Sequence, residues 1–385
     1  MRFLWRNCGR SRHVNDKPIL VLNIFKTMKI KHYLLSGLIA LGLGMTSCSK
    51  DDVNELAGEG EGSMAITLEG SSSTRAIGPV DDVTDSKIHD FYVYVFAWNS
   101  GALEKAVKGD IAKSETVITG LKTNTTKRVV VLTNLGETYP ADITNYADFD
   151  KATKYLNLDK QTPELAKTNG YIMSGVSDNQ ITLTKDQTVK TGITLKRVVA
   201  KVSLGSITVS PEEGTEIDDF KITGVSVQRV APDLTLSPVA SHYVKGSGGY
   251  HYGGFESDDD ELEIKSYLAD DIIMEDALVA NRKYDFNNYF LVFPNKADES
   301  ICTLLTIRGE LDGETLYYPI KVNYKAGEVN TDGMLIEHNK HYQLNVTLKN
   351  IKDGVTDPEL PGEDANLQVT VTLEPWDTLV QNEVW

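Results

Sequence analysis

Short segments in which apolar and polar residues alternate recur along the chain, and they constrain its fold more than any other feature. Met64–Glu69 alternates with a period of two, and Ile88–Trp98 is rich in aromatic and β-branched residues. A helical pattern occurs only around Tyr146–Leu156. Strands at such intervals are typical of β-sandwiches, so we expect an all-β fold. The other predicted strands are Lys127–Asn134, Ile181–Leu183, Thr188–Leu195, Arg197–Leu204, Phe220–Gln228, Leu262–Tyr267, Tyr289–Phe293, Cys302–Glu310, Leu316–Val322, Tyr342–Leu348 and Leu367–Leu373.

The predicted strands divide into two groups, with a boundary near residues 195–200. The chain has 385 residues, of which 41% are hydrophobic, so it is long enough to form two hydrophobic cores. We therefore expect two β-sandwich domains in tandem, over residues 76–196 and 197–385. Residues 48–75 form a polar tether and a first strand that precede these domains, and residues 1–47 form a leader.

The charge of the chain is strongly acidic. Lys and Arg number 39 against 55 Asp and Glu, which gives a formal net charge of −16. Residues 1–47 carry eight Lys or Arg and one Asp, so the remainder of the chain bears −23. Because a nucleic-acid partner requires a basic face, we expect no nucleic acid among the partners.

The leader has the organisation of a secretory signal that begins at Met28. Lys29 and Lys31 precede a short apolar stretch, Tyr33–Leu43, which is too short to span a bilayer as a permanent helix. We interpret residues 1–27 as the product of a start codon assigned too early. A genuine, long amino-terminal region is the alternative.

Met45–Cys48 follows the apolar stretch and resembles a bacterial lipobox, in which the cysteine is acylated and becomes the new amino terminus. Met at −3 and Ser at −1 depart from the commonest form of this motif. We expect lipidation at Cys48, because two or three acyl chains anchor a protein firmly. An ordinary signal cleaved near a cysteine is the alternative reading.

Motifs of catalysis and of metal binding are missing from the sequence. It contains no HExxH, no CxxC pair and no GxSxG. His338 and His341 precede a predicted strand and read as surface histidines, and Asp258–Glu261 reads as a solvated acidic loop rather than a calcium site. Cys302 reads as a buried, inert thiol. We therefore expect no enzyme, no metal and no cofactor.

The two ends of the mature chain carry the most informative features. Arg75 lies in a Ser- and Thr-rich loop after the first strand, where a trypsin-like protease would have access. The carboxyl-terminal segment, residues 366–385, follows a linker that contains two prolines. Cleavage at Arg75 would remove one strand, and the terminal strand of another copy would fit the groove left behind. Alternatively, both segments are ordinary edge strands of their own sandwiches.

Several stretches, taken in order, resemble the fimbrillin family of the Bacteroidetes, whose members are subunits of type V pili. The resemblance covers nearly all of residues 28–385. The matching stretches are the lipobox at Cys48, Arg75-Ala76, Phe91–Phe96, Met173–Gly175, Leu195–Val202, Val292–Asn295, Tyr317–Pro319, Asn339–Leu348 and Trp376-Asp377.

This resemblance implies two transthyretin-like β-sandwich domains and a defined route to a polymer. It implies export as a lipoprotein with a transient lipid anchor in the outer membrane, and then cleavage between Arg75 and Ala76. A carboxyl-terminal strand of the next subunit then fills the vacated groove. Its counterpart here is within residues 366–385, and period two places four of its residues on one face: Leu367, Val369, Val371 and Leu373.

The presence of both a removable strand and a donor strand favours a shaft subunit of a cell-surface fimbria that supports adhesion or biofilm formation. Its partners would be other copies of itself or related pilins, with a host protein or glycan as a further partner. Two alternatives stay open. One is a tip or accessory adhesin that binds through the glycine-rich loop Val244–Glu261. The other is a surface lipoprotein that binds glycans and never polymerises.

Overall fold

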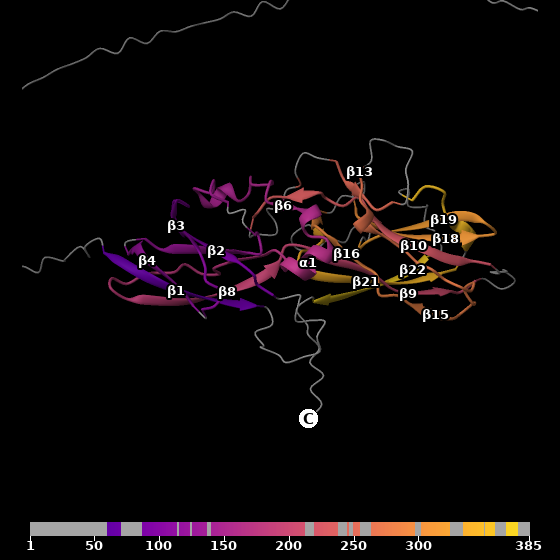
Figure 1. The fold of residues 1–385 in the computed structure, drawn as a ribbon, viewed down its shortest axis with the longest axis horizontal. Coiled ribbons are helices and arrows are strands. Elements are labelled where there is room, and N and C mark those ends of the chain that lie inside the picture. Colours follow the sequence, from indigo (N-terminus) through magenta and orange to yellow (C-terminus); the bar gives the residue numbers. More distant parts are fainter. Residues whose placement is uncertain are drawn as a thin grey trace, which may run out of the picture. The chain divides into compact units, whose positions relative to one another are not determined.

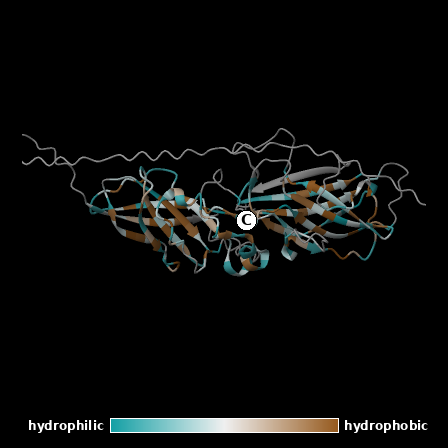
Figure 2. Ribbon diagram, turned by 90° about the horizontal axis from the view of Figure 1, so that it is seen from above, coloured by the Kyte–Doolittle hydropathy of each residue, from teal (hydrophilic) through white to brown (hydrophobic). Residues whose placement is uncertain are grey.

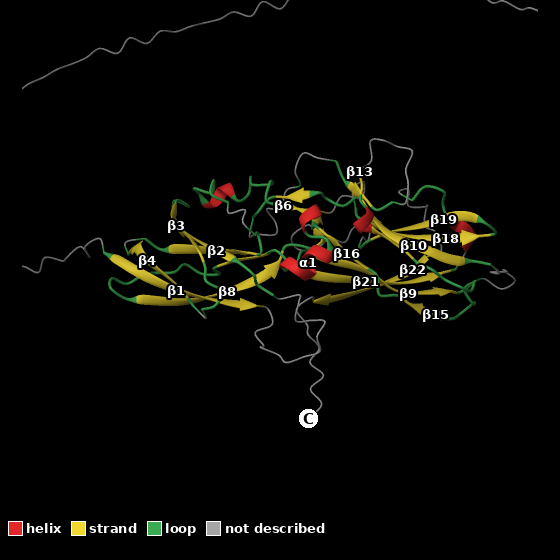
Figure 3. Ribbon diagram, in the orientation of Figure 1, coloured by secondary structure: helices red, strands yellow, loops and turns green. Residues whose placement is uncertain are grey.

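The structure of the protein is a computed structural model dominated by β-strands, which confirms the predicted all-β class (Figure 3). Among the described residues, no helix is both long and apolar enough to cross a membrane. The described residues are 60–70, 87–113, 115–123, 125–136, 140–211, 219–237, 245, 249–254, 263–296, 302–323, 334–349, 351–358 and 367–375.

Residues 61–197 supply every strand of a seven-stranded sheet with the order β3-β2-β5-β7-β8-β1-β4 (Figure 1). Neighbouring strands are antiparallel, except that β1 and β8 run parallel. The strands are β1 (Glu61–Gly70), β2 (Phe91–Ala97), β3 (Leu103–Lys108), β4 (Thr116–Lys122), β5 (Lys127–Thr133), β7 (Met173–Val176) and β8 (Thr188–Arg197).

Residues 200–375 form two larger sheets. In the first sheet the order is β15-β9-β21-β22, with β16 also paired to β9, and in the second it is β14-β10-β18-β19. The strands are β9 (Ala200–Val209), β10 (Lys221–Gln228), β14 (Ala269–Asp271), β15 (Lys283–Asp285), β16 (Tyr289–Val292), β18 (Leu304–Leu311), β19 (Glu314–Lys321), β21 (Lys340–Leu348) and β22 (Leu367–Pro375).

Smaller elements complete the described chain. Three short strand pairs are β6 (Leu156–Asn157) with β11 (Asp233–Leu234), β12 (His251–Tyr252) with β13 (Glu263–Ile264), and β17 (Asn295–Lys296) with β20 (Met334–Ile336). The helix α1 spans Pro163–Asn169, and 3₁₀ turns occupy Tyr146–Asp148, Leu158–Lys160, Ser266–Leu268 and Ile351–Asp353.

Most predicted strands are present, but some predictions were wrong. Ile181–Leu183 contributes only a bridge between Ile181 and Lys127, and the predicted strand Leu262–Tyr267 shortens to Glu263–Ile264. The helical pattern around Tyr146–Leu156 yields a single 3₁₀ turn, because Asn145 caps a turn of three residues. The predicted division between residues 196 and 197 falls before the last residue of β8, Arg197. The division into domains stays a prediction.

Strand β2 is buried over Phe91–Phe96, as its continuous apolar sequence requires. One face of β2 presents Val93 and Val95 to a core that also receives side chains from β1, β4, β5, β7 and β8. The opposite face presents Tyr94 and Phe96 to a second, larger cluster. The seven-stranded sheet therefore contributes side chains to cores on both of its faces.

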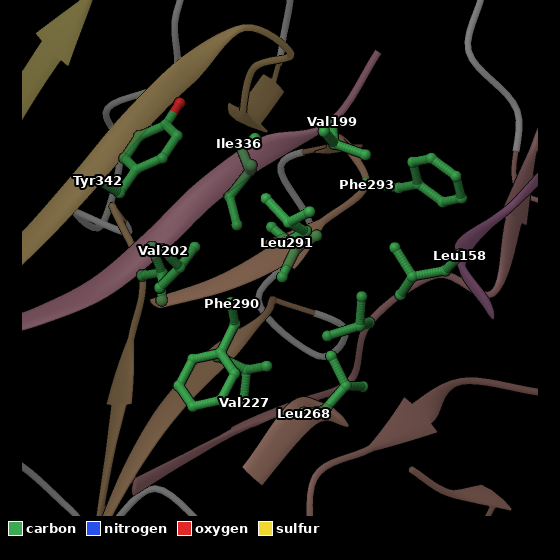
Figure 4. Packing of buried hydrophobic residues seen from close by; sticks show 14 of the residues in the cluster. Leu158, Val199, Val202, Val227, Leu268, Phe290, Leu291, Phe293, Ile336 and Tyr342 are labelled. Atoms are coloured by element: carbon green, nitrogen blue, oxygen red, sulfur yellow. The ribbon is translucent and has the colours of Figure 1, made fainter. Parts of the chain in front are cut away.

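The larger cluster also holds the inward faces of the sheets built from residues 200–348. Val202, Phe290 and Tyr342 come from different strands of the first sheet and point into the same apolar interior as Val227 of β10 (Figure 4). Hydrophobic residues gather on the strands (Figure 2). Burial of alternate strand residues thus holds these layers together.

We expect Phe149→Ala to destabilise the protein by about 3–5 kcal/mol, because it removes a large side chain from a packed aromatic cluster. Phe149 is fully buried, and its ring meets the rings of Tyr94 and Phe96 edge-on at centroid distances of 5.4 and 5.8 Å. Urea unfolding measures the change. The control Ile273→Ala alters a side chain that is 92% exposed, so its effect should stay within about 0.5 kcal/mol. Equal effects of the two variants would contradict this account of the core.

Candidate functional site

Strand β1 lies inside the seven-stranded sheet, between β4 and β8 (Figure 1). Its residues Ser63–Gly70 pair in parallel with Thr188–Leu195, and Glu61–Ile66 pair antiparallel with Lys122–Thr116. The first predicted strand is therefore not an edge strand. The backbone of β1 is paired on both sides over Met64–Ile66, whereas Thr67–Gly70 pair with β8 alone. Both β8 and β4 depend on β1 for the pairing of one of their edges.

The side chains of β1 are part of the core of this sheet. Met64 and Ile66 are 0% and 1% exposed, and they belong to the same cluster as Ile118 of β4 and Ile193 of β8. Full burial of such a side chain contributes roughly 1.5–3 kcal/mol. The alternation predicted from the sequence is confirmed, and it places the larger apolar side chains of β1 in the core.

The amino-terminal end of β1 fits tightly in the sheet. A Cβ atom at Gly62 would lie 3.1 Å from Cγ2 of Thr123 and 3.2 Å from Cβ of Leu183. The register with β4 shifts between Gly62 and Met64, which marks an irregularity there. Only a residue without a side chain fits this position without movement of its neighbours.

The opposite end of β1 borders a hollow of about 230 Å³. Ile66 and Leu68 of β1 form one side of this hollow, and Ile88, Phe91, Ile111, Lys113 and Thr116 form the rest. Ile111 is 57% exposed. Among the described residues, β1 is thus more tightly enclosed at its amino-terminal end than beside Leu68.

The carboxyl-terminal strand β22 pairs with β21 over nine residues, Leu367–Pro375 against Leu348–Lys340. Among the described strands, β22 is the last in the order of its sheet, so it is paired along one edge only, the edge that faces β21. The four predicted donor residues, Leu367, Val369, Val371 and Leu373, lie opposite Leu348, Val346, Leu344 and Tyr342, which are at most 2% exposed. Each donor position thus lies opposite one of the buried residues of β21.

The predicted processing residues Arg75 and Ala76 and the predicted lipid site Cys48 lie outside the described residues. These assignments stay predictions. In the sequence, β1 lies between Cys48 and Arg75. The segment that the two predicted sites would release therefore contains the whole strand that the sheet holds on both sides.

The other residues singled out from the sequence have different outcomes. Cys302 is 0% exposed, which confirms its predicted burial. The acidic run Asp258–Glu261 lies outside the described residues. The interpretation of Val244–Glu261 as a surface loop was wrong in part, because His251–Tyr252 forms β12 and His251 is 2% exposed.

His341 was predicted to be a surface histidine, and that prediction was wrong. It is the second residue of β21, where it is partly buried, and its Nε2 lies 2.8 Å from Oγ of Ser203 on β9. Burial, together with the nearby ammonium group of Lys201, lowers the pKa of His341 to about 4. His341 is therefore a neutral hydrogen-bonding residue between two paired strands.

The chain is similar in sequence to subunits of bacterial fimbriae. Residues 61–222, which begin at the first residue of β1, match the family model of the major fimbrial subunit protein FimA. The chain is 23% identical to a major fimbrium subunit FimA type-2 of Porphyromonas gingivalis, over 93% of this chain and 100% of the relative.

Solved structures share the fold. A fimbrilin (FimA) of Porphyromonas gingivalis superposes with a TM-score of 0.55 at 19% identity, over 82% of this chain and 97% of the other. A protein of Bacteroides eggerthii gives a TM-score of 0.59 at 19% identity, over 82% and 96%. The fold is thus the β-sandwich fold of fimbrilins. The predicted resemblance of this chain to the Bacteroidetes fimbrillin family is confirmed.

We expect the free energy of unfolding to fall as the pH drops from about 6.5 towards 4, in part because of His341. The unfolded chain binds the proton near pH 6.5, whereas the folded chain keeps His341 neutral until about pH 4. Below pH 6.5 the unfolded state thus binds more protons and gains stability. In His341→Gln the loss of stability between pH 7 and pH 5 should be smaller. An NMR titration that gave His341 a pKa near 6.5 would contradict the prediction.

Proposed function

We propose that this protein is a structural subunit of a cell-surface fimbria, which polymerises by exchange of β-strands between copies. The observation that carries the proposal is the position of β1, which is paired on both edges yet belongs to a segment that two predicted processing sites enclose. The similarity to major fimbrial subunits supports the same function. In this proposal the protein is not an enzyme.

The precursor reaches the outer membrane as a lipoprotein, acylated at Cys48. In this state β1 completes the seven-stranded sheet and keeps its core closed. Because β1 already satisfies the backbone groups of β4 and β8, the lipidated precursor does not accept a strand from another copy. The lipid anchor is transient, since it leaves with β1.

Cleavage between Arg75 and Ala76 releases residues 48–75, and with them β1. Loss of β1 leaves the facing edges of β4 and β8 unpaired and uncovers Ile118 and Ile193. Unpaired strand edges beside an apolar core are unfavourable in water and accept an extended strand. The processed subunit is thus ready to bind a strand of the correct alternation.

The strand that fills this groove is the carboxyl-terminal segment of another copy, with Leu367, Val369, Val371 and Leu373 facing the core. In the subunit described here, β22 is the last strand of its sheet and is paired along one edge. In the groove it would be paired along two edges. The gain of a second paired edge drives the transfer, and burial of the whole strand makes dissociation very slow.

We expect Arg75→Gln to block maturation, because a trypsin-like protease requires a basic residue before the cleaved bond. The variant should keep lipid-modified Cys48 as its first residue and should remain monomeric. Amino-terminal sequencing and electrophoresis of unheated samples measure both properties. The control Arg282→Gln changes an exposed arginine and should mature normally.

A second variant separates cleavage from polymerisation. A chain that lacks residues 367–385 should be cleaved normally and should start at Ala76, but it should form no heat-resistant ladder. If this variant polymerised, the donor strand would lie elsewhere and the proposal would fail. A wild-type chain that starts at Cys48 and stays monomeric would favour a surface lipoprotein instead.

A further inference from the structure

A pocket of about 370 Å³ lies beside the start of β2, apart from the groove that holds β1. It is within the size range of small-molecule sites, roughly 300–1,000 Å³. Its walls combine apolar and polar side chains from three stretches of the chain. The lining residues are His89, Asp90, Asn134, Leu135, Gly136, Tyr155, Lys160, Gln161, Leu165, Asn169 and Ile172.

Two buried amides hold the walls of this pocket in place. Asn134, with a positive φ of 58°, accepts a hydrogen bond from the backbone N–H of His89 at 2.8 Å and donates to the backbone oxygen of Tyr171 at 2.7 Å. Gln161 is 2% exposed and accepts from the backbone N–H of Ile172 at 2.9 Å. Such internal bonding preorganises the pocket and lowers the entropic cost of binding.

Two polar groups at the pocket retain unused hydrogen-bonding capacity. Within the part of the chain that the structure describes, Nε2 of His89 and Oδ1 of Asp90 are buried and have no hydrogen-bond partner. The other carboxylate oxygen of Asp90 accepts from the backbone N–H of Gly136 at 3.2 Å. Desolvation raises the pKa of Asp90 above its usual value. A ligand in the pocket could therefore satisfy polar groups that the described residues leave unsatisfied.

The mixture of charges narrows the class of ligand. The carboxylate of Asp90 would repel a small anion, and the ammonium group of Lys160 would repel a small cation. A metal ion also fits poorly, because the described residues contain no group of three or more potential ligands among His, Cys, Asp and Glu. A neutral ligand whose groups both donate and accept hydrogen bonds matches Asp90, His89 and Lys160 together.

The apolar part of the pocket adds a second requirement. Tyr155 is 8% exposed, Ile172 is 3% exposed, and Leu165 of α1 is 39% exposed. With Leu135, these side chains offer a hydrophobic surface beside the polar groups. A sugar ring combines a hydrophobic C–H face with a rim of hydroxyl groups, and it satisfies both halves of the pocket.

We propose that this pocket binds one monosaccharide unit of a neutral glycan. Hydroxyl groups of the sugar donate to Asp90 and accept from Lys160, while the C–H face packs on Tyr155 and Leu165. This site would give the protein a ligand-binding function in addition to assembly. It does not depend on strand exchange, because none of the lining residues belongs to β1 or β22.

NMR of the purified protein, with labelled Ile and Leu methyl groups, tests the site. Glucose, galactose, mannose and fucose serve as probes, each titrated to the highest soluble concentration. At least one sugar should shift the methyl resonances of Leu135, Leu165 and Ile172 in a saturable manner. If none of the four sugars shifts these resonances, or if the shifts lie elsewhere, the proposal is wrong.

Two variants and a matched control make the test specific. Asp90→Asn removes the charged acceptor and should weaken binding roughly tenfold, as the loss of a hydrogen bond to a charged group implies. Leu165→Trp leaves Asp90 in place but should abolish binding, because the larger side chain fills the mouth of the pocket. The control Ile273→Trp adds the same side chain at a position that is 92% exposed and should bind as the wild type does. Unchanged binding by Asp90→Asn and Leu165→Trp would overturn the assignment.

Discussion

Backbone pairing along both edges of β1 is the interaction on which the sheet of residues 61–197 depends. Without β1, the order β3-β2-β5-β7-β8-β1-β4 would end at β8, and β4 would lose the strand that joins it to the rest. Met64 and Ile66 would leave the core at the same time. A sheet can tolerate the loss of such a strand only if an equivalent strand replaces it, because unpaired backbone groups beside a core are costly.

The different positions of β1 and β22 explain why the replacement of β1 by β22 of another copy is favourable. Strand β1 joins two neighbours, whereas β22 has one neighbour and lies at the end of its sheet. Both strands carry apolar residues at alternate positions, so each is suited to a groove with one buried face. Among the described residues, a hollow also lies beside Leu68 of β1. A subunit built in this way gains backbone pairing when β22 moves from the end of its own sheet to the inside of another.

Much of this fold follows from sequence patterns, and the exceptions have identifiable causes. The alternation of Met64–Glu69 and the aromatic and β-branched residues of Ile88–Trp98 predict two strands, and the structure has β1 and β2 at these places. Strand β3 was missed because Leu103–Lys108 is rich in charged residues and only partly buried. Helix α1 is shorter than the usual window for helical periodicity. The pocket at Asp90 could not be predicted, because its walls come from distant stretches of the chain that only the fold brings together. His89 and Ile172, for example, are 83 residues apart in the sequence.

A structure of the assembled fibre, determined by cryo-electron microscopy, tests the central claim most directly. The decisive observation is the identity of the strand between β4 and β8 in each subunit. The account predicts that residues 367–375 of a neighbouring copy occupy this position and that residues 61–70 are absent from the fibre. Fibres in which β1 still lies between β4 and β8 would contradict it.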